Sequence, residues 1–265
     1  MSATLPETSF PTPWPAALAA LLAAPHRLRV HFQPVVDLRR GAVCGYEALA
    51  RPEGDRPAAE WFAAAAREGC AGALEAQVLD AALVQRPLLA AGRTIAVNVS
   101  PAALLSDEVA TVLAGHGSLD ALVVEVTAQG PAADVEALGP RLDALRAAGA
   151  VLAADDADLL AGPLLDALDP TLVKVHHGRL ATGLDLAARL GAVLVAKGVE
   201  SDEELAALAA RGVRLVQGFA LGVPVPVPGE LDRAVAAGLR GLDLGRPDLP
   251  ALGVLAVAAA MPAGD

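Results

Sequence analysis

Aromatic residues and cysteines are both scarce in this sequence. Phe, Trp and Tyr together make up only 3% of the 265 residues, whereas hydrophobic residues reach 54%. The core must therefore be built mainly from Ala, Val and Leu. Cys44 and Cys70 are the only cysteines, and they show no Cys-x-x-Cys spacing. We expect two buried thiols in a protein of the reduced cytoplasm.

Positive charge is also scarce. The sequence has 20 Lys and Arg against 31 Asp and Glu, which gives a net charge of −11 at pH 7. Nonspecific binding of nucleic acid or of an anionic membrane requires a basic surface, so the composition argues against both partners. An acidic pocket for metal cations explains a small part of the acidic excess, and a solvated acidic surface explains most of it.

Long hydrophobic runs are missing as well. The apolar run at residues 16–24 is bounded by Pro15 and Pro25, and a second run covers residues 251–261. Both are far shorter than the roughly 20 residues that span a bilayer. Glu7 and the lack of a basic residue before the first run argue against a signal peptide. We therefore expect a cytoplasmic protein.

The most informative stretch is a predicted β-hairpin. Two β-type runs, at residues 29–36 and 42–49, flank a short polar turn that ends in Gly41. Apolar runs on both sides of a glycine-containing turn are typical of a hairpin. Glu47 stands at the end of the second run, and Arg51 follows four residues later. A carboxylate and a guanidinium in this arrangement suit an anionic ligand that is held with a cation.

After the hairpin, β-type runs and helical segments alternate at regular spacing. The later β-type runs lie at residues 94–100, 122–126, 150–154, 171–175, 192–196 and 213–216. Pro101 suits the start of a helix, and we expect one helix from there to about residue 113. Such alternation indicates parallel strands with helical crossovers, and about eight strands in this length fit a (β/α)8 TIM-type barrel. We expect an N-terminal extension at 1–27, the barrel domain at 28–240 and a C-terminal tail at 241–265.

Polar residues recur where the predicted strands end. They are Glu47, Asn98, Glu125, Asp155, Lys174 and Gln217. In barrels of this type, the carboxyl ends of the strands carry the functional site. Each residue alone could be an ordinary polar residue at a strand end, but six at successive ends predict a site, since only 19% of the residues are charged.

The hairpin also carries a family resemblance. Residues 32–38 read FQPVVDL and residues 45–51 read GYEALAR. This pair resembles the opening of the EAL domain, the cyclic di-GMP phosphodiesterase family, and the resemblance extends over about residues 28–226. It implies a barrel whose first strand is antiparallel to its neighbours.

The resemblance implies a role for each matched residue. The metal ligands, for Mg²⁺ or Mn²⁺, would be Glu47, Asn98, Glu125 and Asp155. The catalytic remnants would be Asp156 and Lys174. The nucleotide would contact Gln33, Arg51 and Gln217.

Three charged positions of the family pattern are substituted. Ala128 replaces a loop-holding Glu, His176 replaces an Asp, and Lys197 replaces a functional Glu. Together these changes remove three negative charges and add one positive charge, a net change of +4, which equals the charge of two divalent cations. We interpret the site as neutralised from within and predict that the Lys197 ammonium lies among Glu47, Glu125 and the Asp155-Asp156 pair. A leucine-containing segment also replaces the family's glycine-rich loop after that pair, and the chain between Lys174 and Ala196 is shorter than in typical members.

These observations favour a degenerate EAL domain that acts as a cyclic di-GMP receptor or as a protein-interaction module. A metal-dependent phosphodiesterase with full or residual activity is the alternative. A Schiff-base aldolase that uses Lys174 is a third reading. His176 and His177 also raise the possibility of a transition-metal site with Asp155 or Asp156, against a simple loop substitution. The oligomeric state and the presence of any metal stay open.

Overall fold

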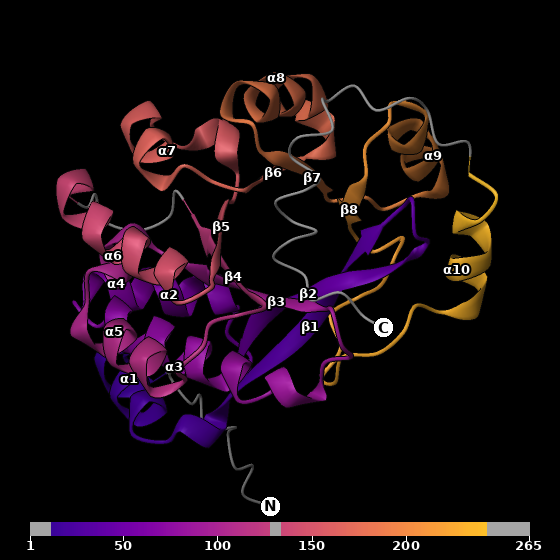
Figure 1. Ribbon diagram of the computed structural model, residues 1–265. Coiled ribbons are helices and arrows are strands. Elements are labelled where there is room, and N and C mark those ends of the chain that lie inside the picture. Colours follow the sequence, from indigo (N-terminus) through magenta and orange to yellow (C-terminus); the bar gives the residue numbers. More distant parts are fainter. Residues whose placement is uncertain (1–11, 128–133, 243–265) are drawn as a thin grey trace, which may run out of the picture.

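The computed structural model describes residues 12–127 and 134–242. Its centre is a closed barrel of eight strands in the order β1 to β8, with helices around the outside (Figure 1). The strands are β1 Leu28–Asp37, β2 Ala42–Pro52, β3 Thr94–Val99, β4 Leu122–Val126, β5 Val151–Ala154, β6 Leu172–His176, β7 Val193–Lys197 and β8 Leu215–Gln217. The predicted (β/α)8-type barrel is confirmed.

The first strand runs against the rest of the barrel, as predicted. β1 pairs antiparallel with both β2 and β8, and every other neighbouring pair is parallel. The turn between β1 and β2 uses Gly41 with a φ of 58°, a left-handed conformation that glycine adopts at little cost. Because β2 to β8 run in one direction, their carboxyl ends gather at one end of the barrel.

Helices cover the outside of the barrel. They are α1 Trp14–Leu22, α2 Ala58–Arg67, α3 Ala71–Leu83, α4 Pro101–Leu104, α5 Asp107–Gly115, α6 Val135–Ala147, α7 Gly162–Leu168, α8 Leu180–Leu190, α9 Asp202–Ala210 and α10 Arg233–Leu239. The single helix expected from Pro101 to about residue 113 is wrong. The Ser106 hydroxyl accepts a hydrogen bond from the Val109 amide at 3.3 Å and starts a new helix there.

The core is built from small aliphatic side chains, as the composition predicts. A large apolar layer joins the helices to the outer face of the barrel. A second, smaller cluster fills the inside of the barrel and consists of Cys44, Ala96, Val123, Val151, Ala153, Leu172, Val193, Val195 and Leu215. The buried charged side chains Glu47, Glu125 and Lys174 lie above this apolar cluster, toward the carboxyl ends of the strands.

The cysteines and the N-terminal segment are only partly as expected. Burial raises the pKa of the Cys44 thiol to about 12, whereas Cys70 is only partly buried, which corrects the expectation of two buried thiols. Trp14 of α1 meets Trp61 of α2 edge to face at 5.3 Å, so this helix packs against the helical layer. In the described ranges, no helix is long and apolar enough to cross a bilayer. Residues 1–11, Ala128 and residues 243–265 lie outside the described part of the chain.

Candidate functional site

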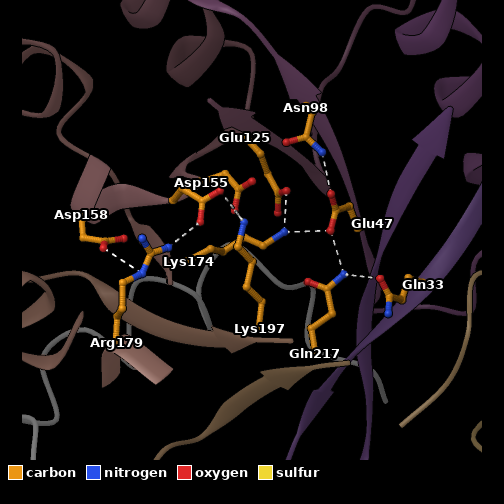
Figure 2. A network of polar contacts seen from close by, with 11 residues as sticks. Gln33, Glu47, Asn98, Glu125, Asp155, Asp158, Lys174, Arg179, Lys197 and Gln217 are labelled. Atoms are coloured by element: carbon orange, nitrogen blue, oxygen red, sulfur yellow. Dashed lines mark hydrogen bonds and ion pairs between the residues drawn. The ribbon is translucent and has the colours of Figure 1, made fainter. Parts of the chain in front are cut away.

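Lys174 lies at the centre of a polar network inside the barrel (Figure 2). Its ammonium on β6 is 3.0 Å from Glu47 Oε2 on β2 and 2.6 Å from Glu125 Oε2 on β4. The lysine side chain is only 2% exposed. A charge at such depth is tolerated when it is paired and hydrogen-bonded. The two carboxylates therefore fix the lysine, and the lysine joins three strands of the barrel.

Glu47 collects further hydrogen bonds from neighbouring strands. The Asn98 amide donates to Glu47 Oε1 at 2.5 Å, and the Gln217 amide donates to Glu47 Oε2 at 2.7 Å. The same Gln217 amide also donates to Gln33 Oε1 at 3.2 Å. Burial opposes ionisation of Glu47, but the charge of Lys174 and these hydrogen bonds outweigh it and lower the pKa of Glu47 to about 2. This carboxylate is therefore ionised at neutral pH.

The charge state of Lys174 bears on its chemistry. Burial lowers the pKa of Lys174, but the carboxylates of Glu125 and Glu47 outweigh that effect and raise the pKa above its ordinary value. Burial raises the pKa of Glu125, and Lys174 offsets only part of that increase. Lys174 is thus a permanent ammonium at neutral pH. A Schiff base forms from a neutral amine, so the environment is the opposite of what an aldolase requires.

Lys197 ends β7 and turns inward to the acids that follow β5. Its ammonium is 2.6 Å from Asp155 Oδ1 and 3.1 Å from Asp156 Oδ2. The predicted inward orientation is confirmed, but the position predicted among all four acids is wrong because Lys174 binds Glu47 and Glu125. Lys174 and Lys197 are the only two lysines in the sequence. Both lysines of this chain therefore lie in this site.

Arg179 adds a third cation that the sequence reasoning missed. It ends the 3-10 turn His177–Arg179 between β6 and α8, and its guanidinium is 3.1 Å from Asp156 Oδ1 and 3.0 Å from Asp158 Oδ2. Figure 2 shows it beside the lysine network. The available signal was Asp158 itself, an acid in a loop where the resemblance leads one to expect a glycine.

The histidine pair does not join the polar network. The exposed His176 accepts a hydrogen bond from the Gly178 amide at 3.1 Å, and His177 Nε2 is 3.5 Å from Glu204 Oε1. Among the residues that the structure describes, no three His, Cys, Asp or Glu side chains form a cluster that could hold a metal ion. The transition-metal site considered for these histidines is therefore not formed.

A pocket of about 360 Å³ opens beside the polar network. Its polar lining includes Arg51, Asn98 and Asp155, and α2 contributes an apolar wall that includes Phe62. Arg51 donates to the Ala50 carbonyl at 2.9 Å and forms no ion pair within the described residues. The sequence-predicted residues Arg51, Asn98 and Asp155 are thus brought to one cavity.

Glu75 of α3 also lines this pocket, and the sequence reasoning missed it. Its carboxylate accepts hydrogen bonds from the Ser100 amide at 2.6 Å and from the Ser100 hydroxyl at 2.8 Å. Burial raises the pKa of Glu75, and the two hydrogen bonds oppose that shift only in part. Glu75 lies inside a helix, where no strand-end pattern marks it, so the sequence offered no signal for its place in the pocket.

The site offers a divalent cation the amide oxygen of Asn98, but its carboxylates are paired with lysines. Asn98 Oδ1 is buried and has no hydrogen-bond partner among the described residues. An amide oxygen beside carboxylates is a ligand that hard cations accept. However, Lys174 binds two of these carboxylates and Lys197 binds Asp155. The Asp155-Asp156 pair does not fit a second metal ion while Lys197 lies against both acids.

A closed barrel with one antiparallel strand and an oxygen-rich site at the strand ends defines a distinct class of (β/α)8-type protein. The comparison with protein families identifies the family within this class. The chain belongs to the EAL domain family, whose model matches residues 17–224.

Two curated relatives match the chain along most of its length. A signalling protein of Caulobacter vibrioides, described as uncharacterised, is 32% identical, and the match covers 77% of this chain and 28% of that protein. An uncharacterised protein of Sinorhizobium fredii is 27% identical over 75% of this chain and 27% of its own length. The chain therefore spans less than a third of these relatives.

Two solved structures of similar fold are complexes with cyclic di-GMP. The PaMucR phosphodiesterase in complex with cyclic di-GMP is 27% identical with a TM-score of 0.67, and the match covers 78% of this chain and 96% of that one. Klebsiella pneumoniae BlrP1 with manganese and cyclic di-GMP is 27% identical with a TM-score of 0.65, over 77% of this chain and 58% of that one. Both are similar to this chain in fold and in sequence.

Proposed function

We propose that this EAL domain binds cyclic di-GMP, hydrolyses it weakly or not at all, and acts as a receptor or protein-interaction module in signalling. The observation that carries the proposal is the ion pair of Lys197 with both Asp155 and Asp156. The protein itself thereby neutralises two acids that the family resemblance assigns to metal binding and catalysis. A fixed ammonium at this place repels an entering divalent cation.

The ligand half of the proposal rests on the pocket and on the two cyclic di-GMP complexes of similar proteins. Arg51 lines the pocket and can donate charge-assisted hydrogen bonds to a phosphate oxygen. Phe62 and Leu49 provide apolar surface against which a base can pack. The pocket volume of about 360 Å³ falls in the range of small-molecule sites.

Mg²⁺ or Mn²⁺ is the cofactor that the family implies, and Glu47, Asn98, Glu125 and Asp155 are the residues that would hold it. When bound, such an ion polarises a phosphoryl oxygen and lowers the pKa of a water molecule. Lys174 orients Glu47 and Glu125 through their Oε2 atoms. The buried Asn98 Oδ1 is the ligand atom of this set that has no hydrogen-bond partner among the described residues.

Hydrolysis is expected to be weak because the acids that would handle protons are already engaged. Asp156 lies between Lys197 and Arg179, and Asp155 lies against Lys197. An acid held in this way is a poor acceptor for the proton of an attacking water. Losing one positioned acid–base group typically lowers the rate by about 10²–10⁴-fold.

Residual phosphodiesterase activity is the alternative function. The specific observation in its favour is Asn98 Oδ1, which is buried beside Glu47 without a hydrogen-bond partner in the described residues. Such an amide oxygen is a ligand that an entering divalent cation can use. Mn²⁺-dependent formation of the linear dinucleotide would support this alternative.

Calorimetry with cyclic di-GMP, with and without Mg²⁺, tests binding, and chromatography of a Mn²⁺ reaction tests hydrolysis. We expect heat of binding in both titrations and no linear dinucleotide above a blank without protein. Linear product at the rates of active family members would overturn the hydrolytic half of the proposal. Absence of binding in both titrations would overturn the receptor half.

Arg51→Ala should weaken cyclic di-GMP binding by about tenfold or more, because a hydrogen bond to a charged group contributes about 1.5–3 kcal/mol. The control is Arg67→Ala, since Arg67 is exposed at the end of α2 and does not line the pocket. If the two variants bind equally well by calorimetry, Arg51 has no role in the ligand site.

A further inference from the structure

The turn after β5 is held by a cation that the family resemblance does not explain. Arg179 reaches back from the segment after β6 and bridges two acids of this turn, with 3.1 Å to Asp156 Oδ1 and 3.0 Å to Asp158 Oδ2. One guanidinium therefore holds two acids of the same short turn. Arginine suits this geometry because its planar fork presents several donors at fixed angles.

Asp158 depends on this contact. Its side chain is only 6% exposed, and its Oδ1 has no hydrogen-bond partner among the described residues. A buried carboxylate that loses its counter-ion is strongly unfavourable and tends to move toward water. Arg179 thus makes the buried position of Asp158 possible, and Asp158 anchors the turn from inside.

Asp156 is shared between two cations. Its Oδ1 faces Arg179 at 3.1 Å and its Oδ2 faces Lys197 at 3.1 Å. Its backbone has a φ of 44°, in the left-handed region that Asp adopts more readily than most residues. The Leu159 amide donates to the Asp156 carbonyl at 2.7 Å and closes the turn. Both the backbone and the side chain of Asp156 are therefore fixed.

We propose that Arg179 is a positioning residue that holds the 155–159 turn closed on Lys197, so that the Asp155-Asp156 pair cannot turn toward a second divalent cation. This inference rests on the proposed function, because it assumes that Lys197 stands in for a metal ion. Arg179 is then a second cation of the protein, besides Lys197, that holds these acids. Replacing Lys197 alone then restores only part of the metal affinity, since Arg179 still holds Asp156.

The test compares Mn²⁺ affinity by calorimetry in three variants: Lys197→Glu alone, Lys197→Glu with Arg179→Leu, and Lys197→Glu with Arg189→Leu. Arg189 is the control because it lies at the opposite end of α8 from Arg179, is 56% exposed and is 3.9 Å from Asp166 rather than from an acid of the turn. We expect Lys197→Glu to bind Mn²⁺ more tightly than the parent. Adding Arg179→Leu should raise that affinity by roughly twofold to fivefold, the effect of freeing one carboxylate from a partly exposed pair. Adding Arg189→Leu should not.

A second readout does not depend on metal. Because the sequence has only two lysines, protein labelled with ¹³C-lysine gives two assignable sets of side-chain signals. In the parent background, Arg179→Leu should shift the Lys197 signals and leave those of the buried Lys174 in place. Arg179→Lys, which keeps the charge but cannot bridge both acids, should give a smaller shift, and Arg189→Leu should give none.

The outcomes separate the two proposals. If Arg179→Leu moves neither the Lys197 signals nor the Mn²⁺ affinity, the positioning role of Arg179 is wrong. If Lys197→Glu gains no Mn²⁺ affinity while Arg179→Leu moves the Lys197 signals, Arg179 positions the turn, but Lys197 is not a substitute for a metal ion. A gain in both experiments supports both proposals.

Discussion

At the scale of single residues, the two lysines differ in their burial and in the acids that they pair with. Lys174 is fully buried between Glu47 and Glu125, and its role follows from depth, because an unpaired charge there is not tolerated. Lys197 is 23% exposed and faces Asp155 and Asp156 near the rim. We therefore expect that loss of the deep lysine mainly affects stability and that loss of the shallow one mainly affects the charge of the site.

Lys174→Met should lower the free energy of unfolding by about 3–5 kcal/mol, because it leaves two buried carboxylates without a counter-ion. Urea unfolding at pH 7 measures the loss. Lys197→Met is the natural control, since it removes the only other lysine from a more exposed position and should cost much less. Equal losses in the two variants would contradict this division of roles.

At the scale of secondary-structure elements, α3 and α4 are joined through Glu75. Ser100 caps α4 by accepting a hydrogen bond from the Ala103 amide at 3.2 Å. Glu75 in turn accepts from both the amide and the hydroxyl of Ser100. Ser100 follows β3 two residues after Asn98, so this contact also fixes the strand end that carries a candidate metal ligand. A helix of four residues has little stability of its own and depends on such contacts.

Glu75→Gln should change how stability depends on pH. Burial raises the pKa of Glu75 above its ordinary value of 4.5, so the folded state binds this proton more tightly than the unfolded state. The carboxylate then costs stability as the pH rises from about 4.5 through the folded-state pKa, and the cost stays constant above it. Urea unfolding should therefore show that the free energy of unfolding of the variant rises relative to that of the parent between pH 4 and pH 7. Glu60→Gln, an exposed control on α2, should track the parent, and a pH-independent difference for Glu75→Gln would contradict this reading.

At the scale of the whole molecule, the barrel closes through a short contact. β1 and β8 share only three paired positions, from Val35 opposite Gln217 to Asp37 opposite Leu215. Asp37 has a side-chain exposure of 2%, and its Oδ2 accepts from Arg214 Nε at 2.9 Å and from Arg214 Nη2 at 2.7 Å. These two hydrogen bonds to one carboxylate oxygen fasten the strand that follows α9 to the hairpin that begins the barrel.

Arg214→Leu should destabilise the whole barrel by about 3 kcal/mol, because it leaves the buried Asp37 carboxylate without its main counter-ion. The loss should appear as one cooperative transition at lower urea concentration, monitored by circular dichroism. Arg211→Leu changes an exposed arginine three residues earlier and should have little effect. A separate early transition of the hairpin would show that closure is not coupled to the rest of the fold.

Much of the fold could be predicted because its signals are local. The hairpin turn and the alternation of strands and helices are patterns of neighbouring residues, and both match the structure. Of the polar residues predicted at strand ends, four lie at or next to such an end, whereas Glu47 and Lys174 lie in the middle of β2 and β6. The split between α4 and α5 was missed although Ser106, Asp107 and Glu108 form an ordinary helix start. The composition of the whole segment favours one continuous helix, whereas the start of the second helix is marked only by these three residues.

The sequence by itself determined that a barrel would gather Glu47, Asn98, Glu125 and Asp155 at one end, because parallel strands finish on the same side. Only the tertiary structure decided which cation meets which acid. Register places His176 opposite Lys197, so Lys174 lies two residues deeper on β6 and takes the buried glutamates, while Lys197 takes the aspartates above them. Arg179, Asp158 and Glu75 likewise acquire their partners across 20 or more residues of sequence. Their contacts depend on how far each side chain lies along its strand or loop, and no local pattern encodes that distance.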